Sequence, residues 1–178
     1  MTLDAIARLM APILQFTSDE IWQYMPTRGG RESNIHLSLL PQANADFKDD
    51  ALADRWEFLL KVRGEATKAL EAARAQKLIG HPLDAAVTIS VPADAYDKLQ
   101  PFAADLRSLL IVSQASLVKD EALENAFRSD DVDGLVIGVT PAPGDKCERC
   151  WVHDTTVGSH SEQPTICQRC QDALEQIS

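Results

Sequence analysis

Four cysteines are the residues of this chain whose types and spacing indicate the clearest chemistry. They form two Cys-x-x-Cys pairs, Cys147 with Cys150 and Cys167 with Cys170, and 16 residues separate the pairs. This spacing is typical of a zinc site with four thiolate ligands. Two residues between thiolates allow one turn to present both sulfurs to one ion, and two such turns complete a tetrahedron with Zn–S distances of about 2.3 Å. We therefore predict one structural Zn²⁺ bound by all four cysteines.

Disulfides or free thiols in an ordinary fold are the alternatives for these cysteines. Disulfides are disfavoured in a reducing cytoplasm, and the chain contains no cysteine outside the two pairs. A catalytic zinc is disfavoured as well, because four cysteines leave no position for water or substrate. His153 and His160 could each replace a cysteine, but their spacing favours solvent-exposed loop histidines. We expect the segment to fold only with metal.

The residues beside the cysteines are basic or aromatic. Lys146, Arg149 and Arg169 flank the predicted ligands, where their N–H groups could offset the negative charge of a zinc ion with four thiolates. Arg149 and Trp151 also suit nucleic-acid contact, since an indole stacks on an unpaired base and an arginine binds phosphate or a base edge. Packing of Trp151 over the metal-binding turn is the competing interpretation.

Two short helices are predicted ahead of the elements that lead to this site. Apolar residues recur at helical spacing over residues 3–16, and Pro12 should kink or end that helix. A capping box of Thr17 and Glu20 then predicts a second helix that begins at Ser18 and stops before Pro26. A loop-rich connection follows.

The middle of the chain predicts a long helix followed by a mixture of strands and helices. The helix should run from Asp50 to about Gln76 and end at Gly80 and Pro82. Strands are predicted at 87–91, 110–118 and 135–140, with one or two helices over 96–109 and an acidic loop over 120–133. We therefore predict an α+β fold with an N-terminal α-helical part (1–80), a small α/β junction subdomain (81–140) and a C-terminal four-cysteine zinc knuckle or ribbon (141–178).

The charge of the chain limits its possible partners. A formal net charge of −10 argues against a free-standing nucleic-acid binder, and only residues 50–80, with 6 basic and 5 acidic side chains, are net positive. A small contacting element attached to a larger RNA-binding body could tolerate this balance. No stretch approaches the roughly 20 apolar residues of a membrane helix, and the N-terminus lacks signal-peptide features. We expect a cytoplasmic location and no membrane partner.

Several motifs resemble those of a known family. Cys-Glu-Arg-Cys-Trp at 147–151, Val-Gly at 157–158 and the second cysteine pair are similar to the C-terminal zinc-binding motif of bacterial isoleucyl-tRNA synthetases. Residues 10–14 and 16–22 resemble the helical anticodon-binding domain shared by the isoleucine, valine and leucine enzymes. The isoleucine-type pattern continues in order through 60–65, 72–77, 79–80 and 83–86. The resemblance covers nearly the whole chain, and the zinc block narrows it to isoleucine.

The resemblance implies a role in tRNA recognition. In that family the helical domain and zinc module hold the anticodon arm, and by motif match Arg149 and Trp151 lie nearest the anticodon bases. The implied partners are isoleucine tRNA and the remainder of the synthetase, and we expect a monomer. The family attaches isoleucine to tRNA with ATP, but this sequence has no His-Ile-Gly-His-like or Lys-Met-Ser-Lys-Ser-like motif. We expect an inactive fragment, with ATP bound only in the missing catalytic part.

Two other function classes compete with tRNA recognition. A zinc-dependent protein-interaction module would use Trp151 as an interface anchor. A hydrolase could be assembled from His81 with Asp84 or Asp97, but no nucleophile accompanies them. Basic residues of the long helix are further candidates for RNA contact, although pairing with glutamates three or four residues away on a solvated face is the favoured interpretation. These basic residues are Lys61, Arg63, Lys68 and Arg74, and the glutamates are Glu57, Glu65 and Glu71.

Overall fold

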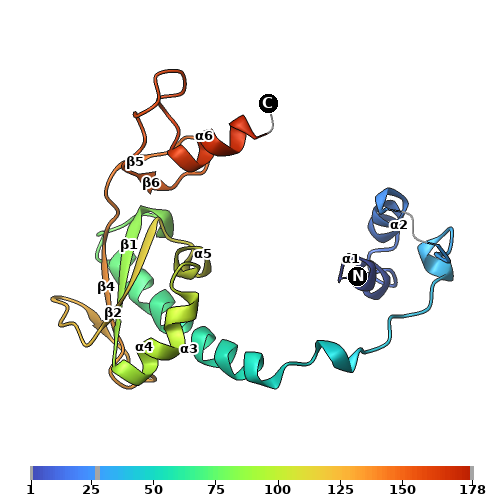
Figure 1. Cartoon of the computed structure of the whole chain (residues 1–178), viewed down its shortest axis with the longest axis horizontal. Coiled ribbons are helices and arrows are strands. Elements are labelled where there is room, and N and C mark those ends of the chain that lie inside the picture. The colour runs from blue at the N-terminus through green and yellow to red at the C-terminus, as the bar shows by residue number, and fades with distance from the viewer. Residues whose placement is uncertain (1, 27–28, 177–178) are drawn as a thin grey trace. The chain divides into compact units, whose positions relative to one another are not determined.

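The computed structural model describes residues 2–26 and 29–176. The chain divides into two compact units, with the boundary between Asp49 and Asp50 (Figure 1). The predicted α+β class is confirmed, whereas the division into 1–80, 81–140 and 141–178 stays a prediction. None of the helices in the described part of the chain combines the length and the apolarity that a membrane crossing requires.

The first unit begins with two helices, α1 (Thr2–Met10) and α2 (Gln15–Tyr24). Helix α1 ends two residues before Pro12, as predicted. The predicted capping box at Thr17 is wrong, because α2 begins earlier and its N-cap position is Leu14, which makes no side-chain cap hydrogen bond. The chain between the helices is already turned, with the amide of Leu14 donating to the carbonyl of Met10 at 2.7 Å. The second helix therefore starts from this turn and needs no side-chain cap.

The core of the first unit is small and centres on Trp22. Its indole Nε1 donates to the carbonyl of Glu32 at 2.9 Å, and the guanidinium of Arg31 lies 4.5 Å from the ring centroid. The other buried apolar residues are Ala7, Ala11 and Ile35. Ile35 belongs to the single turn η1 (Ile35–Leu37), and a further turn, η2 (Ala45–Phe47), follows. Many larger apolar side chains remain on the surface of this unit.

The second unit begins with the long helix α3 (Asp50–Ala75), which agrees with the predicted range. Its buried face includes Leu59, Val62, Ala66 and Leu70. The helix ends because Lys77 adopts a left-handed conformation at φ +60°, while the amide of Leu78 donates to the carbonyl of Ala73. A single turn, η3 (Pro82–Asp84), then leads into the sheet.

A four-stranded sheet lies against the helices of the second unit (Figure 1). Its strand order is β2 (Gln114–Lys119), β1 (Ala85–Val91), β4 (Val136–Pro141) and β3 (Phe127–Arg128). Strand β1 is parallel to β2 and antiparallel to β4, with Val87 opposite Ala115 and Val139. The strands predicted near 87–91 and 135–140 are confirmed. The short β3 was not predicted, because two residues in an acidic segment carry no periodic signal.

The crossover from β1 to β2 contains α4 (Ala93–Leu99), the turn η4 (Gln100–Phe102) and α5 (Leu106–Leu110). The predicted start of a strand at Leu110 is wrong, because this residue ends α5 and the strand begins at Gln114. Ile111 caps the helix in a left-handed conformation at φ +57°. Tertiary packing of α5 has therefore overridden the β propensity of Ile111 and Val112.

The C-terminal part of the second unit consists of β5 (Asp145–Lys146), β6 (His153–Asp154) and α6 (Gln168–Glu175). Strands β5 and β6 form a two-stranded antiparallel ribbon. Gly144 enters this ribbon at φ +88°, and a Cβ added there would lie 2.3 Å from the carbonyl carbon of Asp154. Only glycine fits this approach without moving the backbone. The ribbon and α6 together hold the four cysteines.

Candidate metal centre

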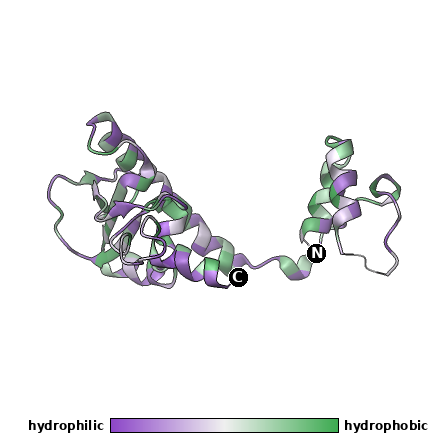
Figure 2. Cartoon of the chain, turned by 90° about the horizontal axis from the view of Figure 1, so that it is seen from above, coloured by the Kyte–Doolittle hydropathy of each residue, from purple (hydrophilic) through white to green (hydrophobic). Residues whose placement is uncertain are grey.

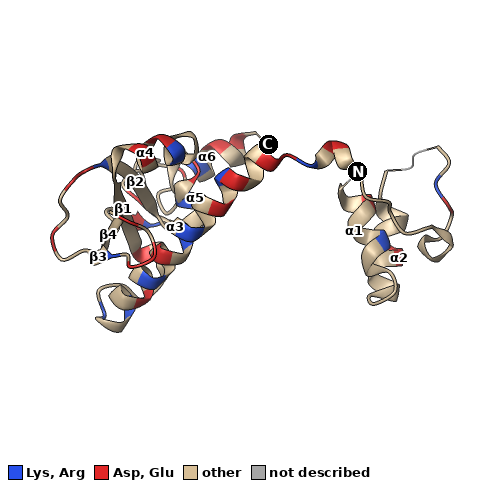
Figure 3. Cartoon of the chain, turned by 90° about the horizontal axis from the view of Figure 1, so that it is seen from below, with Lys and Arg blue, Asp and Glu red and all other residues tan. Residues whose placement is uncertain are grey.

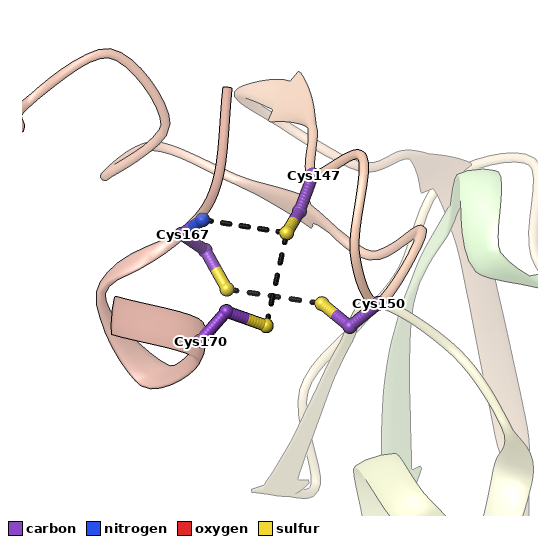
Figure 4. A group of neighbouring side chains, drawn as sticks. All are labelled: Cys147, Cys150, Cys167 and Cys170. Atoms are coloured by element: carbon purple, nitrogen blue, oxygen red, sulfur yellow. Dashed lines mark hydrogen bonds between the residues drawn. The ribbon is translucent and has the colours of Figure 1, made fainter. Parts of the chain in front are cut away.

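The four cysteine sulfurs converge on one point (Figure 4). The Sγ atoms of Cys147 and Cys170 lie 3.8 Å apart, and those of Cys150 and Cys167 lie 3.7 Å apart. All four sulfurs lie within 4.8 Å of one another. A tetrahedron with metal–sulfur distances of about 2.3 Å has edges of about 3.8 Å, so the arrangement fits Zn²⁺. The distances are far longer than the roughly 2.05 Å of a disulfide.

Each cysteine pair is positioned by a tight local turn. In the first pair, the amide of Trp151 donates to the carbonyl of Cys147 at 2.8 Å, which closes the turn. In the second pair, Cys167 occupies the N-cap position of α6 and Cys170 lies in its first turn. The amide of Cys167 donates to the sulfur of Cys147 at 3.3 Å and so links the two turns. The second turn is therefore the start of a helix, which the sequence analysis did not predict.

The pKa values of two of the thiols are shifted in opposite directions. Burial alone would raise the pKa of Cys147, but hydrogen bonds from backbone amides of Cys150, Cys167 and Arg149 lower it to about 6. Burial raises the pKa of Cys167 to about 12, helped by the neighbouring cysteine side chains. Without a metal, one thiolate is favoured while a neighbouring thiol keeps its proton. A bound cation reverses this, because it favours the ionised form of every ligand.

Two arginines face the sulfurs from opposite cysteine pairs. The Nη1 atom of Arg149 donates to the Sγ atom of Cys170 at 3.6 Å. A hydrogen bond to the sulfur of Cys150 raises the pKa of Arg169. The predicted charge-compensating role of these two residues agrees with this geometry.

Trp151 projects from the first cysteine turn into solvent. Its side chain and backbone together are 61% exposed, and its backbone adopts a left-handed conformation at φ +64°. The Nζ atom of Lys146 lies 5.9 Å from the centroid of the ring. The indole is therefore exposed beside a cation and does not form a core contact. The residue is exposed, and its role in stacking on a base stays a prediction.

Neither histidine near the cysteines belongs to the four-sulfur cluster. His153 and His160 are both half-buried, so the expectation of solvent-exposed loop residues is wrong. The Nε2 atom of His153 lies 3.4 Å from a carboxylate oxygen of Asp84, and its Nδ1 atom lies 3.2 Å from the carbonyl of Gly144. His153 therefore contacts the body of the unit and the entry to the ribbon.

A buried serine joins the metal-binding ribbon to the sheet. The side chain of Ser113 is fully enclosed, accepts from the amide of His153 at 2.8 Å and donates to the carbonyl of Leu83. The amide of Ala142 also donates to the carbonyl of Asp84, at 2.7 Å. Sequence reasoning missed this joint, since the residues are 30 to 40 positions apart and a single serine carries no signal.

Two residues of the hydrolase hypothesis, His81 and Asp84, have a structural role. Asp84 accepts hydrogen bonds from the amides of Gly80 and His81, while His81 Nδ1 accepts from the amide of Leu83. Burial opposes ionisation of Asp84, but these two amides and the nearby His153 together lower the pKa of its carboxyl. The pair caps the turn η3, and no nucleophile lies in this arrangement of hydrogen bonds.

The basic residues of α3 are paired along the helix, and charges of both signs alternate on its surface (Figure 3). Lys61 contacts Glu57 at 2.9 Å, and Arg74 contacts Glu71 at 2.9 Å. Lys68 contacts the buried Glu65 at 2.6 Å and also Asp131 at 2.7 Å, and Arg63 donates to the carbonyl of Leu109. The predicted pairing with glutamates is therefore confirmed for Lys61, Lys68 and Arg74. It is wrong for Arg63, which bonds a carbonyl, and Glu65 is buried and does not lie on a solvated face.

Two family matches agree with this combination of helices and cysteine cluster. Residues 144–173 match a zinc finger found in FPG and IleRS, and residues 1–89 match the anticodon-binding domain of tRNA ligase. The fold and the site thus combine an anticodon-binding domain of the tRNA-ligase class with a zinc finger. Because the second match covers half of the chain, the chain belongs to the anticodon-binding domain family of tRNA ligases.

The similar proteins specify the type of ligase. The chain is 45% identical over 175 residues to an isoleucine–tRNA ligase of Geobacter sulfurreducens, covering 98% of this chain and 19% of that protein. It is 45% identical over 173 residues to the enzyme of Syntrophotalea carbinolica, with 97% and 18% covered. For Moorella thermoacetica the identity is 38% over 178 residues, with 99% and 19% covered. The chain corresponds to the anticodon-binding and zinc-finger region of these ligases and spans about 19% of their length.

Proposed function

We propose that this chain recognises the anticodon arm of isoleucine tRNA as part of a cytoplasmic isoleucine–tRNA ligase. Two findings support the proposal: an anticodon-binding family match and a zinc-finger match occur in one chain, and the relatives are isoleucine–tRNA ligases. The ligase would attach isoleucine to its tRNA with ATP. Catalysis and ATP binding would lie in the additional length of the relatives, and this chain alone would be inactive.

The zinc part of the proposal assigns Cys147, Cys150, Cys167 and Cys170 as ligands of one structural Zn²⁺. The sulfur separations of 3.7 and 3.8 Å and the enclosure of three of the four cysteines support this assignment. When bound, the ion crosslinks the first cysteine turn to the start of α6. Four thiolates complete its coordination, so its contribution is stability and shape.

The proposal for RNA recognition depends mainly on Trp151. This residue is 61% exposed, on a turn whose geometry the metal ligands define, which makes its indole a rigid platform for an unpaired base. Arg149 uses Nη1 for the sulfur of Cys170, and we propose that its remaining N–H groups contact a phosphate or base edge. The zinc finger would therefore present both residues to the anticodon loop.

The first unit supplies the second contact that the proposal requires, with the rest of the ligase. Its surface carries apolar side chains that include Phe16 at 90%, Leu39 at 84% and Phe47 at 69% exposure, and apolar residues recur along its helices (Figure 2). A cavity of about 860 Å³ lies among Leu37, Leu39 and Phe47. Apolar area of this kind indicates a protein contact. We propose that other parts of a monomeric ligase cover it.

A zinc-dependent protein-interaction module is the second candidate. The exposed Trp151 favours it as well, because tryptophan is a frequent anchor of protein interfaces, and the net charge of −10 is no obstacle to it. Ionic strength separates the two candidates, since binding to phosphates falls steeply with salt whereas an apolar interface does not.

The test combines metal analysis with tRNA binding. Plasma mass spectrometry on the purified chain should find about one zinc per chain, and filter binding should detect isoleucine tRNA at low salt. Chelation and Trp151→Ala should both weaken binding, and Trp151→Phe should retain part of it because an aromatic face remains. Zinc at this ratio without any tRNA binding, or binding that ignores Trp151, would contradict the role in recognition.

A further inference from the structure

A pocket lies beside the zinc finger, and it belongs neither to the cysteine cluster nor to the surroundings of Trp151. It has a volume of about 470 Å³ and lies where α3 ends, between the turn at Leu78 and the ribbon residue His153. Arg74, Lys77 and Asp84 are its charged lining residues. In a chain with a net charge of −10, this small site carries two permanent cations against one carboxylate. This excess of positive charge in the pocket therefore favours binding of an anion.

Lys77 is the charged lining residue whose side chain has no partner among the described residues. The side chains of the other five basic residues from Asp50 to Gly80 each have a carboxylate or carbonyl partner, whereas only the backbone amide of Lys77 is bonded, to the carbonyl of Arg74. Its backbone adopts φ +60° at the position after a helix where glycine is favoured. A non-glycine residue there costs about 1 kcal/mol or more in stability. Packing and pairing give no reason for lysine at this place.

The ribbon links one lining residue of the pocket to the surroundings of Trp151. Lys146 and His153 are directly opposite each other in the pairing of β5 with β6, so their side chains leave the same face. His153 lines the pocket, and Lys146 lies 5.9 Å from the ring of Trp151. Basic and titratable groups therefore follow one another from the exposed indole to Lys77.

We propose that this pocket binds a phosphate group of the RNA backbone, with Lys77 as the main cation, next to the nucleotide that stacks on Trp151. The proposal rests on the function proposed above and adds a contact to it. The Nζ atom of Lys77 donates to a phosphate oxygen, and Arg74 contributes charge while its Nη1 atom stays paired with Glu71.

Asp84 is the lining group that opposes an anion. Its Oδ2 atom accepts from the amides of Gly80 and His81, and its Oδ1 atom faces His153 at 3.4 Å. These partners spread the negative charge into the protein. The phosphate therefore binds on the side of Lys77, and the apolar rim at Leu78 and Ile79 contacts the adjoining ribose.

The first test compares two lysines that differ in their partners. Lys77→Gln and Lys61→Gln each remove one positive charge from the same region, but Lys61 is already paired with Glu57. For a single strand, each phosphate contact adds about 0.7 to the steepness with which log affinity falls as log salt concentration rises. Losing one contact therefore makes the salt dependence shallower by about 0.7 and lowers tRNA affinity at 0.1 M salt about five-fold. We expect this change for Lys77→Gln and not for Lys61→Gln. Equal effects of the two variants would overturn the proposal.

A third variant excludes misfolding as the cause. Lys77→Gly places the favoured residue at φ +60°, so its melting temperature should equal or exceed that of the parent chain. The same five-fold loss of affinity should nevertheless appear. Unchanged tRNA binding by Lys77→Gly, together with weakened binding by Trp151→Ala, would overturn the phosphate pocket and leave the proposed function standing.

A small probe tests the pocket independently of tRNA. Titration of the ¹⁵N-labelled zinc-loaded chain with the dinucleotide UpU should shift the amide signals of Gly80 and His153, and Lys77→Gln should abolish these shifts. Shifts confined to the surroundings of Trp151 would overturn the pocket while supporting base stacking. Shifts at neither place would overturn both.

Discussion

Replacing Trp151 by glycine and by alanine separates the backbone cost of this residue from its contacts. At φ +64° the residue following Cys150 adopts a conformation that glycine reaches freely and residues with a Cβ do not. Both substitutions remove the same indole, so the lost packing and the lost contact with Lys146 cancel in the comparison. The left-handed cost of the remaining Cβ is about 1 kcal/mol. The glycine variant should therefore be the more stable by about that amount.

Competition with a zinc chelator measures this difference, because metal binding and folding of such a segment are coupled. A difference of about 1 kcal/mol corresponds to about five-fold tighter zinc binding by Trp151→Gly than by Trp151→Ala. Both variants should lose tRNA affinity equally, since neither has a stacking surface. Zinc binding by the alanine variant that equals or exceeds that of the glycine variant would refute the assignment of strain to this turn.

Three further perturbations address the zinc finger and its joint with the sheet. Ser113→Ala leaves the amide of His153 without its buried acceptor and should lower the free energy of unfolding in urea by about 1–3 kcal/mol. Ser116→Ala, in the adjoining strand β2 and exposed, should change it by less. Gly144→Ala brings a Cβ against Asp154 at φ +88° and should lower the melting temperature by several degrees. Acidification should release zinc, because protons compete with the metal for all four thiolates. A metal-sensitive dye would detect the released zinc as the pH falls. Zinc that stays bound at pH 3 would contradict a four-thiolate site.

Local sequence patterns predicted α1 to α5 and the strands β1, β2 and β4, but not β3, the ribbon strands β5 and β6 or the last helix α6. The helical periodicity from Asp50 onward predicted α3 nearly to the residue, because this period needs only neighbours three and four positions apart. The same reasoning placed β1 and β4. It misplaced the start of β2, because Leu110 and Ile111 are apolar in either structure and only the packing of α5 decides between them. The start of α2 was misplaced for a related reason, since a turn of backbone hydrogen bonds replaced the predicted side-chain cap.

The candidate site likewise has features that the sequence predicted and features that only the structure showed. The cysteine spacing alone indicated a zinc site with four thiolates, because each pair of ligands lies within one turn of chain. The exposure of Trp151, its left-handed backbone and the contact of Arg149 with the sulfur of Cys170 were not readable from composition. They depend on how the first cysteine turn faces α6.

The sequence by itself therefore determined the features whose partners are close along the chain: the cysteine pairs, the long helix and its internal ion pairs. Only the tertiary structure decided which distant residues meet. Ser113 meets His153 across 40 positions, and Lys77 reaches the pocket that His153 also lines. Such contacts depend on how α3, the sheet and the ribbon pack together. A residue in this packing makes its contacts only when many other residues are already in place. No pattern within a single segment specifies them.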